Sequence, residues 1–105
     1  MEKLTFEFFG GGPVNATRAP ALVGVVGSGN LEILIEHEAL EGRCAVEILT
    51  AARGFGDTWK AVLDDFFARH QLADVRISIN DVGATPAVVS LRLDQAVENF
   101  LGGAA

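Results

Sequence analysis

The chain has 105 residues, of which 50% are hydrophobic and 21% are charged, and its formal net charge is −6. This length can bury one hydrophobic core and is too short for two ordinary domains, so residues 1–105 are predicted to form a single domain. The acidic charge argues against a nucleic-acid partner, because phosphate binding requires clustered lysine and arginine. It favours docking on basic protein surfaces instead.

The cysteine count and the hydropathy pattern exclude further classes of protein. Cys44 is the single cysteine, which excludes an internal disulfide and a zinc site built from paired cysteines. The first residues alternate charged with apolar side chains and contain no apolar signal region. No apolar run is long enough to span a bilayer. We therefore expect a cytoplasmic protein that does not enter a membrane.

The N-terminal segment is predicted to be a strand followed by irregular chain. Apolar residues alternate with polar ones from Leu4 to Phe8, which indicates a half-buried strand. The strand ends at residues 10–13, which are three glycines and a proline. Residues 14–20 show no periodicity and are predicted to be a loop.

The next segment predicts a hairpin and a further strand. Two runs rich in β-branched residues, 22–27 and 31–37, are separated by turn-forming residues, as in a hairpin. A polar turn over residues 38–42 follows. The alternation then resumes at Cys44 and predicts a fourth strand.

Before Gly54 the apolar residues occur at every second position. After it they recur every three or four residues, as in an amphipathic helix. Asp57 is the predicted N-cap of this helix. A single wide apolar stripe predicts that the helix lies across the sheet. The residues of that stripe are Trp59, Val62, Leu63, Phe66 and Phe67.

The C-terminal part predicts a fifth strand and a second helix. Residues 74–80 alternate again, and residues 81–83 form a turn. Thr85 is the predicted N-cap and Pro86 the first helical residue, while Gly102 ends the helix. The apolar face of this helix is formed by Val89, Leu93, Ala96, Val97 and Phe100.

The element order β-β-β-β-α-β-α predicts an α+β fold. In chain order, four strands precede the first helix, and the fifth strand separates the two helices. We expect a two-layer sandwich in which two helices pack on one face of a mostly antiparallel sheet of about five strands.

The candidate functional residues lie at the tip of the predicted hairpin. Gly27, Ser28, Gly29 and Asn30 separate its two strands, and glycine and asparagine both tolerate the positive φ that such a turn requires. Flanked by glycines, the Ser28 hydroxyl has no neighbouring side chain to screen it. The geometry suits a residue to which a group is attached, although a serine between glycines can also be a plain turn residue.

Two catalytic or nucleotide-binding interpretations of this stretch are weaker. A phosphate-binding glycine loop needs a helix N-terminus after it, whereas residues 31–36 have the pattern of a strand. A serine-hydrolase elbow needs glycines two residues on either side of the serine, and these positions are Val26 and Asn30.

The two histidines offer no metal site by spacing, since no further ligand lies at a suitable distance along the chain from His37 or His70. Glu36 and Glu38 flank His37 and are interpreted as surface charge. An enzyme in which Ser28 reacts with His37 or His70 as its base is a further possibility, and it requires the fold to bring an imidazole to the hydroxyl.

Three blocks of the sequence resemble the acyl carrier subunit family of malonate decarboxylase, which is related to the carrier subunit of citrate lyase. The blocks are Ser28 with the strand after it, residues 55–57 and residues 80–84. They occur in the order of the family and span most of the chain from residue 22 to residue 100. The N-terminal strand and residues 83–86 resemble the malonate branch more than the citrate branch, which stays the alternative.

The resemblance implies a carrier without catalytic activity of its own. Ser28 would carry the prosthetic group 2′-(5″-phosphoribosyl)-3′-dephospho-CoA through a phosphodiester, and its thiol would hold acetyl and malonyl groups as thioesters. Gly27, Gly29 and Asn30 would shape the turn that presents Ser28. The implied partners are the acyltransferase and decarboxylase subunits and the transferase that attaches the group, with no metal. A structural subunit in which Ser28 is a plain turn residue is the rival hypothesis.

Overall fold

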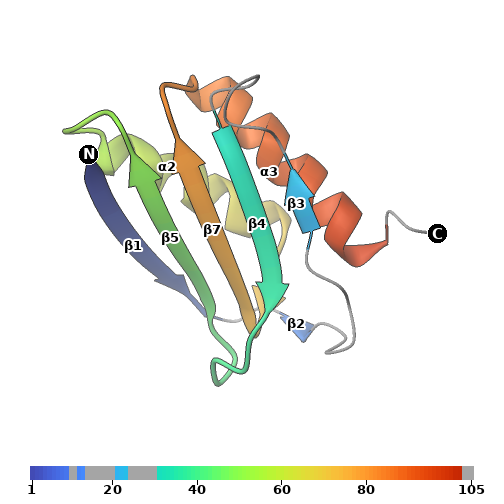
Figure 1. Ribbon diagram of the computed structural model, residues 1–105. Coiled ribbons are helices and arrows are strands. Elements are labelled where there is room, and N and C mark those ends of the chain that lie inside the picture. The colour runs from blue at the N-terminus through green and yellow to red at the C-terminus, as the bar shows by residue number, and fades with distance from the viewer. Residues whose placement is uncertain (10–11, 14–20, 24–30, 103–105) are drawn as a thin grey trace.

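The computed structural model describes residues 1–9, 12–13, 21–23 and 31–102. A five-stranded sheet in the order β1-β5-β7-β4-β3 has two helices against one face, which confirms the predicted α+β sandwich (Figure 1). The elements are β1 (Glu2–Phe8), β2 (Gly12–Pro13), β3 (Ala21–Val23), β4 (Leu31–His37), β5 (Cys44–Thr50), α2 (Gly56–Arg69), β6 (Leu72–Ala73), β7 (Val75–Asp81) and α3 (Pro86–Leu101).

The sheet is antiparallel except at its centre. β1 pairs with β5, and β4 pairs with both β3 and β7, in antiparallel registers. β5 and β7 are parallel neighbours, because α2 returns the chain to the same end of the sheet between them. β4 and β5 follow each other in the chain but flank β7 in space, so the turn between them is not a hairpin turn.

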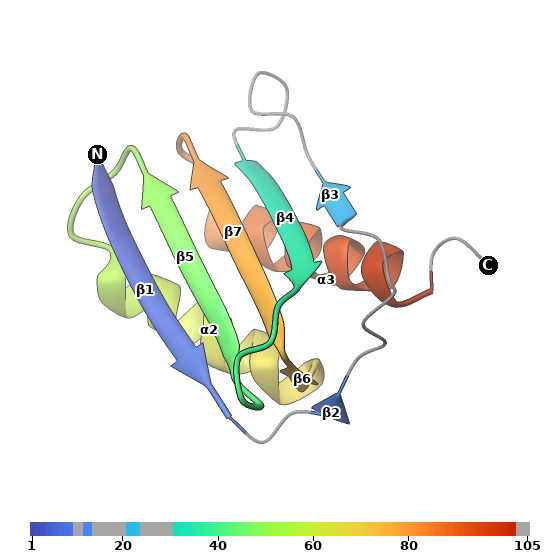
Figure 2. The same ribbon diagram turned by 60° about the horizontal axis from the view of Figure 1, so that its bottom comes forward.

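A second, much smaller sheet pairs the two-residue strands β2 and β6 in parallel (Figure 2). Neither strand was predicted, because two residues are too short to show a periodicity. This pairing ties the chain after β1 to the chain after α2.

The core lies between the helices and one face of the sheet. Strand residues alternate between this buried face and the open face, which explains the period of two in the sequence. The predicted apolar faces of both helices are the faces that pack on the sheet, with Val62 only partly buried. The largest fully buried side chains include Leu31, Ile33, Ile48, Leu63, Phe66, Ile77 and Leu93.

The two helix starts differ in their capping. The Thr85 side chain accepts a hydrogen bond from the backbone N–H of Val88, and Pro86 begins α3, as predicted. The prediction that Asp57 caps α2 was wrong. α2 begins one residue earlier, its N-cap is Phe55, and no side chain caps it. Asp57 lies in the first turn, where a negative charge still interacts favourably with the helix dipole.

Several strand boundaries differ from the prediction: β1 begins at Glu2, and β7 extends to Asp81, the first residue of the predicted turn. β7 begins at Val75 because Asp74 has a φ of 58°, which is outside the strand region. β3 covers residues 21–23, whereas the predicted strand extended to residue 27. The rest of that strand, and the predicted loop over residues 14–20, fall outside the described residues.

Candidate functional site

The four residues predicted at the hairpin tip, Gly27, Ser28, Gly29 and Asn30, lie outside the described residues. Both strands that flank them are described. β3 and β4 pair antiparallel as predicted, with Val23 opposite Ile33, and Ser28 lies halfway along the chain between these two residues. Three residues of chain span at most about 11 Å, so Ser28 is tethered within that distance of Leu31, where β4 begins.

Leu31 lies at the end of the sheet where β5 and β7 also end. It is paired with Asp81, the last residue of β7, and Asp81 is paired in turn with Thr50, the last residue of β5. The chain enters α2 after β5 and α3 after β7, so both helices begin near this end (Figure 1). The fold therefore brings Leu31, three residues after Ser28 in the chain, and the two helix starts to the same end of the sheet.

A buried polar pair organises this end of the molecule. The Thr50 hydroxyl donates a hydrogen bond of 2.8 Å to Asp81 Oδ2 and accepts one from the backbone N–H of Ala52. Asp81 Oδ1 accepts bonds from the N–H groups of Gly83 and Ala84 at 3.1 and 2.8 Å. Both side chains are buried. Their hydrogen bonds fix the two chain segments that lead into the helices.

A groove of about 440 Å³ opens beside this pair, with a lining drawn from the first turns of α2, the start of α3 and the ends of β5 and β7. Its volume lies in the range of small-molecule sites. Among the described residues that line it there is no lysine, arginine or histidine. The apolar lining residues include Phe55, Trp59, Val62, Pro86 and Val89, and the polar ones are Thr50, Thr58 and Asp81.

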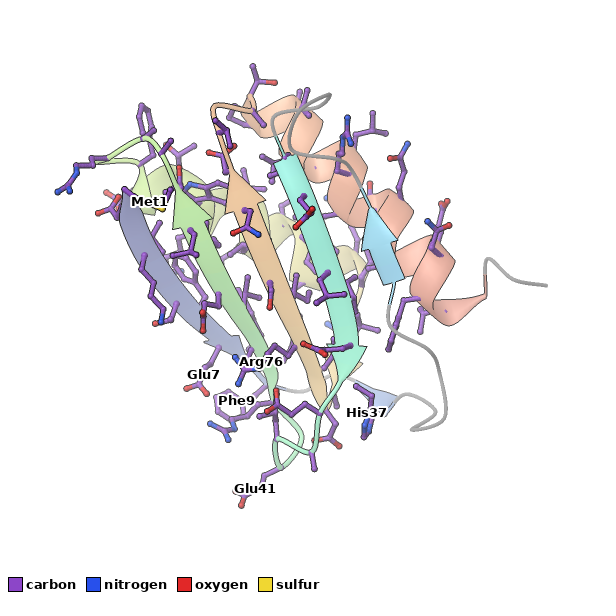
Figure 3. All side chains as sticks on the ribbon, viewed as in Figure 1. Met1, Glu7, Phe9, His37, Glu41 and Arg76 are labelled. Atoms are coloured by element: carbon purple, nitrogen blue, oxygen red, sulfur yellow. The ribbon has the colours of Figure 1, made fainter. Side chains whose placement is uncertain are left out.

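The face of the sheet away from the helices is open and carries side chains of both charges, including Lys3 paired with Glu47, with carboxylates in excess. Glu7 and Arg76 lie two strands apart near one end of this face (Figure 3). Arg76 forms ion pairs with Glu38 and Glu47, and the hydrogen bond to Glu38 raises the pKa of its guanidinium. Further carboxylates of this face come from Glu32 and Glu36 on β4.

His37 lies at the far end of β4 from Leu31, and His70 lies at the far end of α2 from the groove. His37 ends β4, about 20 Å along the strand from Leu31 at the usual rise per residue. His70 follows the last residue of α2, where its Nε2 lies 2.9 Å from a carboxylate oxygen of Asp94 and its ring contacts Phe66. These contacts account for His70 as a structural residue at the end of α2.

Two residues of this region, Thr50 and Asp81, were not recognised as a pair in the sequence. They are 31 residues apart, and only the parallel pairing of β5 and β7 brings them together. A partial signal exists, because an aspartate two residues before a glycine is typical of a side chain that bonds the backbone of a following turn.

The described part of the chain contains neither a metal-binding cluster nor a helix that could span a membrane. No group of three or more histidine, cysteine, aspartate or glutamate side chains there could hold a metal ion. Within the same residues, neither helix has both the length and the apolar character that crossing a bilayer requires.

Sequence comparison identifies relatives over nearly the whole chain. The model of the acyl carrier protein family described as malonate decarboxylase delta subunit matches residues 18–100. The malonate decarboxylase acyl carrier protein of Xanthomonas euvesicatoria pv. vesicatoria is 66% identical over 97% of both chains. The protein of the same name from Burkholderia cepacia is 65% identical over 91% of this chain and 87% of its own.

Structural comparison agrees with the sequence. A chain in the crystal structure of a Pseudomonas malonate decarboxylase hetero-tetramer in complex with malonate superimposes with a TM-score of 0.81 at 37% identity, covering 95% of this chain and 99% of that one. Since family model, relatives and fold all agree, the chain belongs to the malonate decarboxylase delta subunit family of acyl carrier proteins.

Proposed function

We propose that this chain is the acyl carrier subunit of a biotin-independent malonate decarboxylase, and that Ser28 carries its prosthetic group. The observation that carries the proposal is the match to acyl carrier proteins of malonate decarboxylase over nearly the full length of the chain. The match includes the residues around Ser28, which fall within the region covered by the family model.

The pairing of β3 with β4 supports Ser28 as the attachment residue. The register is centred on residue 28, so continued pairing of the two strands would bring this residue to the tip of the hairpin. Glycines on both sides of Ser28 allow a transferase to approach its hydroxyl closely. The neighbouring residues Gly27, Gly29 and Asn30 would then serve to present the serine rather than to react.

The proposed group is 2′-(5″-phosphoribosyl)-3′-dephospho-CoA in a phosphodiester with Ser28 Oγ. Attachment from the triphosphate donor forms this bond and breaks one phosphoanhydride, so diphosphate leaves and the hydroxyl proton passes to a base. When bound, the group supplies a thiol that holds acetyl or malonyl as a thioester, whose carbonyl stabilises the charge left by loss of carbon dioxide. The chain itself contributes reach and recognition.

The partners that follow from this function are the acyltransferase and decarboxylase subunits and the prosthetic-group transferase. A relative of this chain is part of a hetero-tetramer, which supports assembly with other subunits. The open sheet face and the net charge of −6 provide an acidic surface that would be steered to basic patches on those partners.

The proposal is tested by the intact mass of the chain produced together with its modifying enzymes. The chain should gain the mass of one prosthetic group, and Ser28→Ala should abolish the gain. Ser78→Ala and Ser90→Ala are matched controls, because they remove the other serines of the sequence. Both controls should be modified as fully as the wild type.

An unmodified wild-type chain under these conditions would refute the attachment. If Ser28→Ala also supported full decarboxylase activity in the assembled complex, Ser28 would be a plain turn residue and the chain a structural subunit. Loss of activity in Ser28→Ala, with normal assembly, distinguishes the carrier function from that alternative.

A further inference from the structure

The groove between α2 and α3 has no part in the proposed attachment at Ser28, yet it lies at the end of the sheet where the described chain stops after Val23 and resumes at Leu31. Asp81 connects the two features, because it lines the groove and pairs with Leu31, the first residue of β4. An arm attached at Ser28 would therefore be tethered within about 11 Å of Leu31, whose strand partner Asp81 lines the groove.

We propose that this groove shelters the acetylated thiol end of the prosthetic arm at rest, and that it disfavours the malonylated end. The inference rests on the proposed attachment of the arm to Ser28. Its ligand is chemically a neutral pantetheine thioester, and the phosphorylated part of the arm stays outside.

The lining of the groove fits an uncharged, mostly apolar chain. Trp59, Val62 and Val89 supply apolar surface, while the exposed hydroxyl of Thr58 is a polar group available for a hydrogen bond to an amide. The Thr50 hydroxyl is already bonded to Asp81 and Ala52. Phe55 also lines the groove and is 51% exposed, so an incoming chain would cover apolar surface that is in contact with water.

The charge of the groove disfavours anionic ligands. Asp81 is the charged side chain in its described lining, and no cation accompanies it there. A phosphate or a malonyl carboxylate in the groove would meet the Asp81 carboxylate in a partly desolvated setting, and among the described lining residues only the backbone N–H groups at the two helix starts would offset the repulsion. An acetyl thioester adds no charge and avoids this cost.

This selectivity has a consequence for the carrier. The acetylated arm would be withdrawn from water between reaction cycles, and exchange of acetyl for malonyl would weaken its hold on the groove. The malonylated arm would then be free to reach a partner subunit.

Trp59 provides a direct probe of this binding. It is the single tryptophan of a chain without tyrosine, it lines the groove, and only 6% of its surface is exposed. The unmodified full-length chain is titrated with free S-acetylpantetheine and with S-malonylpantetheine, and Trp59 fluorescence and backbone amide NMR shifts are followed. We expect saturable binding of the acetyl compound and about tenfold weaker binding of the malonyl compound, which corresponds to about 1.4 kcal/mol.

Three variants and one control test whether the groove is responsible for the binding and for its selectivity. Thr58→Phe places a ring in the groove from an exposed position of α2, and Ala84→Leu narrows it from the α3 side. Both should weaken the acetyl response at least about tenfold. Ala61→Phe, also exposed on α2 but outside the lining, is the matched control and should bind as the wild type. Asp81→Asn removes the charge and should bring the two ligands to similar affinity.

The inference is overturned if neither ligand binds, if both bind equally well to the wild type, or if Thr58→Phe and Ala84→Leu, shown to be folded by circular dichroism, bind like the control. These outcomes are separate from the test of the proposed function, because the ligands are free and the chain is unmodified. A missing mass gain at Ser28 leaves the titration result standing, and a failed titration leaves the mass gain standing.

Discussion

Cys44 is a buried residue of the core, and its thiol has no access to water. Burial raises the pKa of this thiol to about 12, because the thiolate would lose its hydration in the interior. Cys44 begins β5, as the alternation in the sequence predicted, and its side chain lies on the buried face of that strand.

We expect Cys44 to be inert in the native protein. At pH 8 an aromatic disulfide reagent should not react with the folded chain, and it should react with one thiol per chain after denaturation in urea. Rapid reaction of the folded chain would contradict the buried position. In the modified protein the same assay would report the thiol of the arm alone.

Asp74 immediately precedes β7, and its side chain forms hydrogen bonds with the turn between β4 and β5. Its Oδ1 accepts hydrogen bonds from the N–H groups of Leu40 and Gly42, both at 2.9 Å. These bonds to the ionised form, from Gly42 first and then Leu40, lower the pKa of the Asp74 carboxyl. Asp74 has a positive φ, which asparagine also tolerates, so Asp74→Asn removes the charge without adding backbone strain.

The stabilisation by Asp74 should depend on pH with a defined sign. Because the carboxyl has a lower pKa in the folded than in the unfolded chain, its contribution is complete above the ordinary value of 3.8 and disappears as pH falls through the folded-state pKa. Urea unfolding should show Asp74→Asn to be less stable than the wild type at pH 7, with the difference shrinking in acid. Glu41→Gln, which removes a carboxylate at an exposed position of the same turn, is the control and should show no such trend.

At the scale of elements, the ends of β5 and β7 are joined by a polar pair in an otherwise apolar interior. The Thr50 hydroxyl is one of the hydrogen-bond partners of the Asp81 carboxylate, and Asp81 also holds the two N–H groups that precede α3. Loss of the Thr50 hydroxyl leaves the buried Oδ2 of Asp81 without the hydrogen bond it accepts from that group.

Thr50→Val should therefore destabilise the protein although it keeps the shape of the side chain. We expect a loss of about 1–3 kcal/mol in the free energy of unfolding, measured with urea. Thr5→Val makes the same chemical change on the exposed face of β1 and should have little effect. Equal effects of the two substitutions would show that the hydroxyl of Thr50 is not important.

The start of α3 depends on a side-chain cap, whereas the start of α2 does not. Thr85→Ala should reduce the free energy of unfolding by about 1 kcal/mol, because the N–H of Val88 loses its partner. Ser90→Ala, within the same helix, is the control for removing a hydroxyl and should be close to neutral. The two variants are compared by chemical denaturation.

At the scale of the whole molecule, the two faces of the sheet have different roles. One face is covered by both helices and forms the core, and the other remains open and carries acidic side chains (Figures 1 and 3). An acidic open face on a protein of net charge −6 creates a field that attracts basic surfaces and is screened by salt.

Charge reversal on the open face should slow association with the partner subunits. The double variant Glu32→Lys and Glu36→Lys should lower the association rate several-fold at low ionic strength, with a smaller effect at high salt. Asp64→Lys with Asp65→Lys makes the same change of net charge on exposed positions of α2. If this control slowed association equally, steering would depend on total charge rather than on the open face.

Most of the elements could be predicted from the sequence, because the period of apolar residues is a local property. The alternation in β4 and β7 and the helical stripe from Trp59 to Phe67 each report which side of an element is buried. Errors occurred where the local signal was weak, as with Asp57 at the start of α2 and the two-residue strands β2 and β6.

The sequence by itself determined the fold class, the buried faces and the resemblance around Ser28, since all three follow from local patterns of residues along the chain. Only the tertiary structure decided that β7 lies between β4 and β5, because strand order depends on pairing between residues far apart in the chain. That order brings Thr50, Asp81 and Leu31 together at the end of the sheet where the groove opens. The physical reason is that a cavity is formed by packing between elements, and no single element contains it.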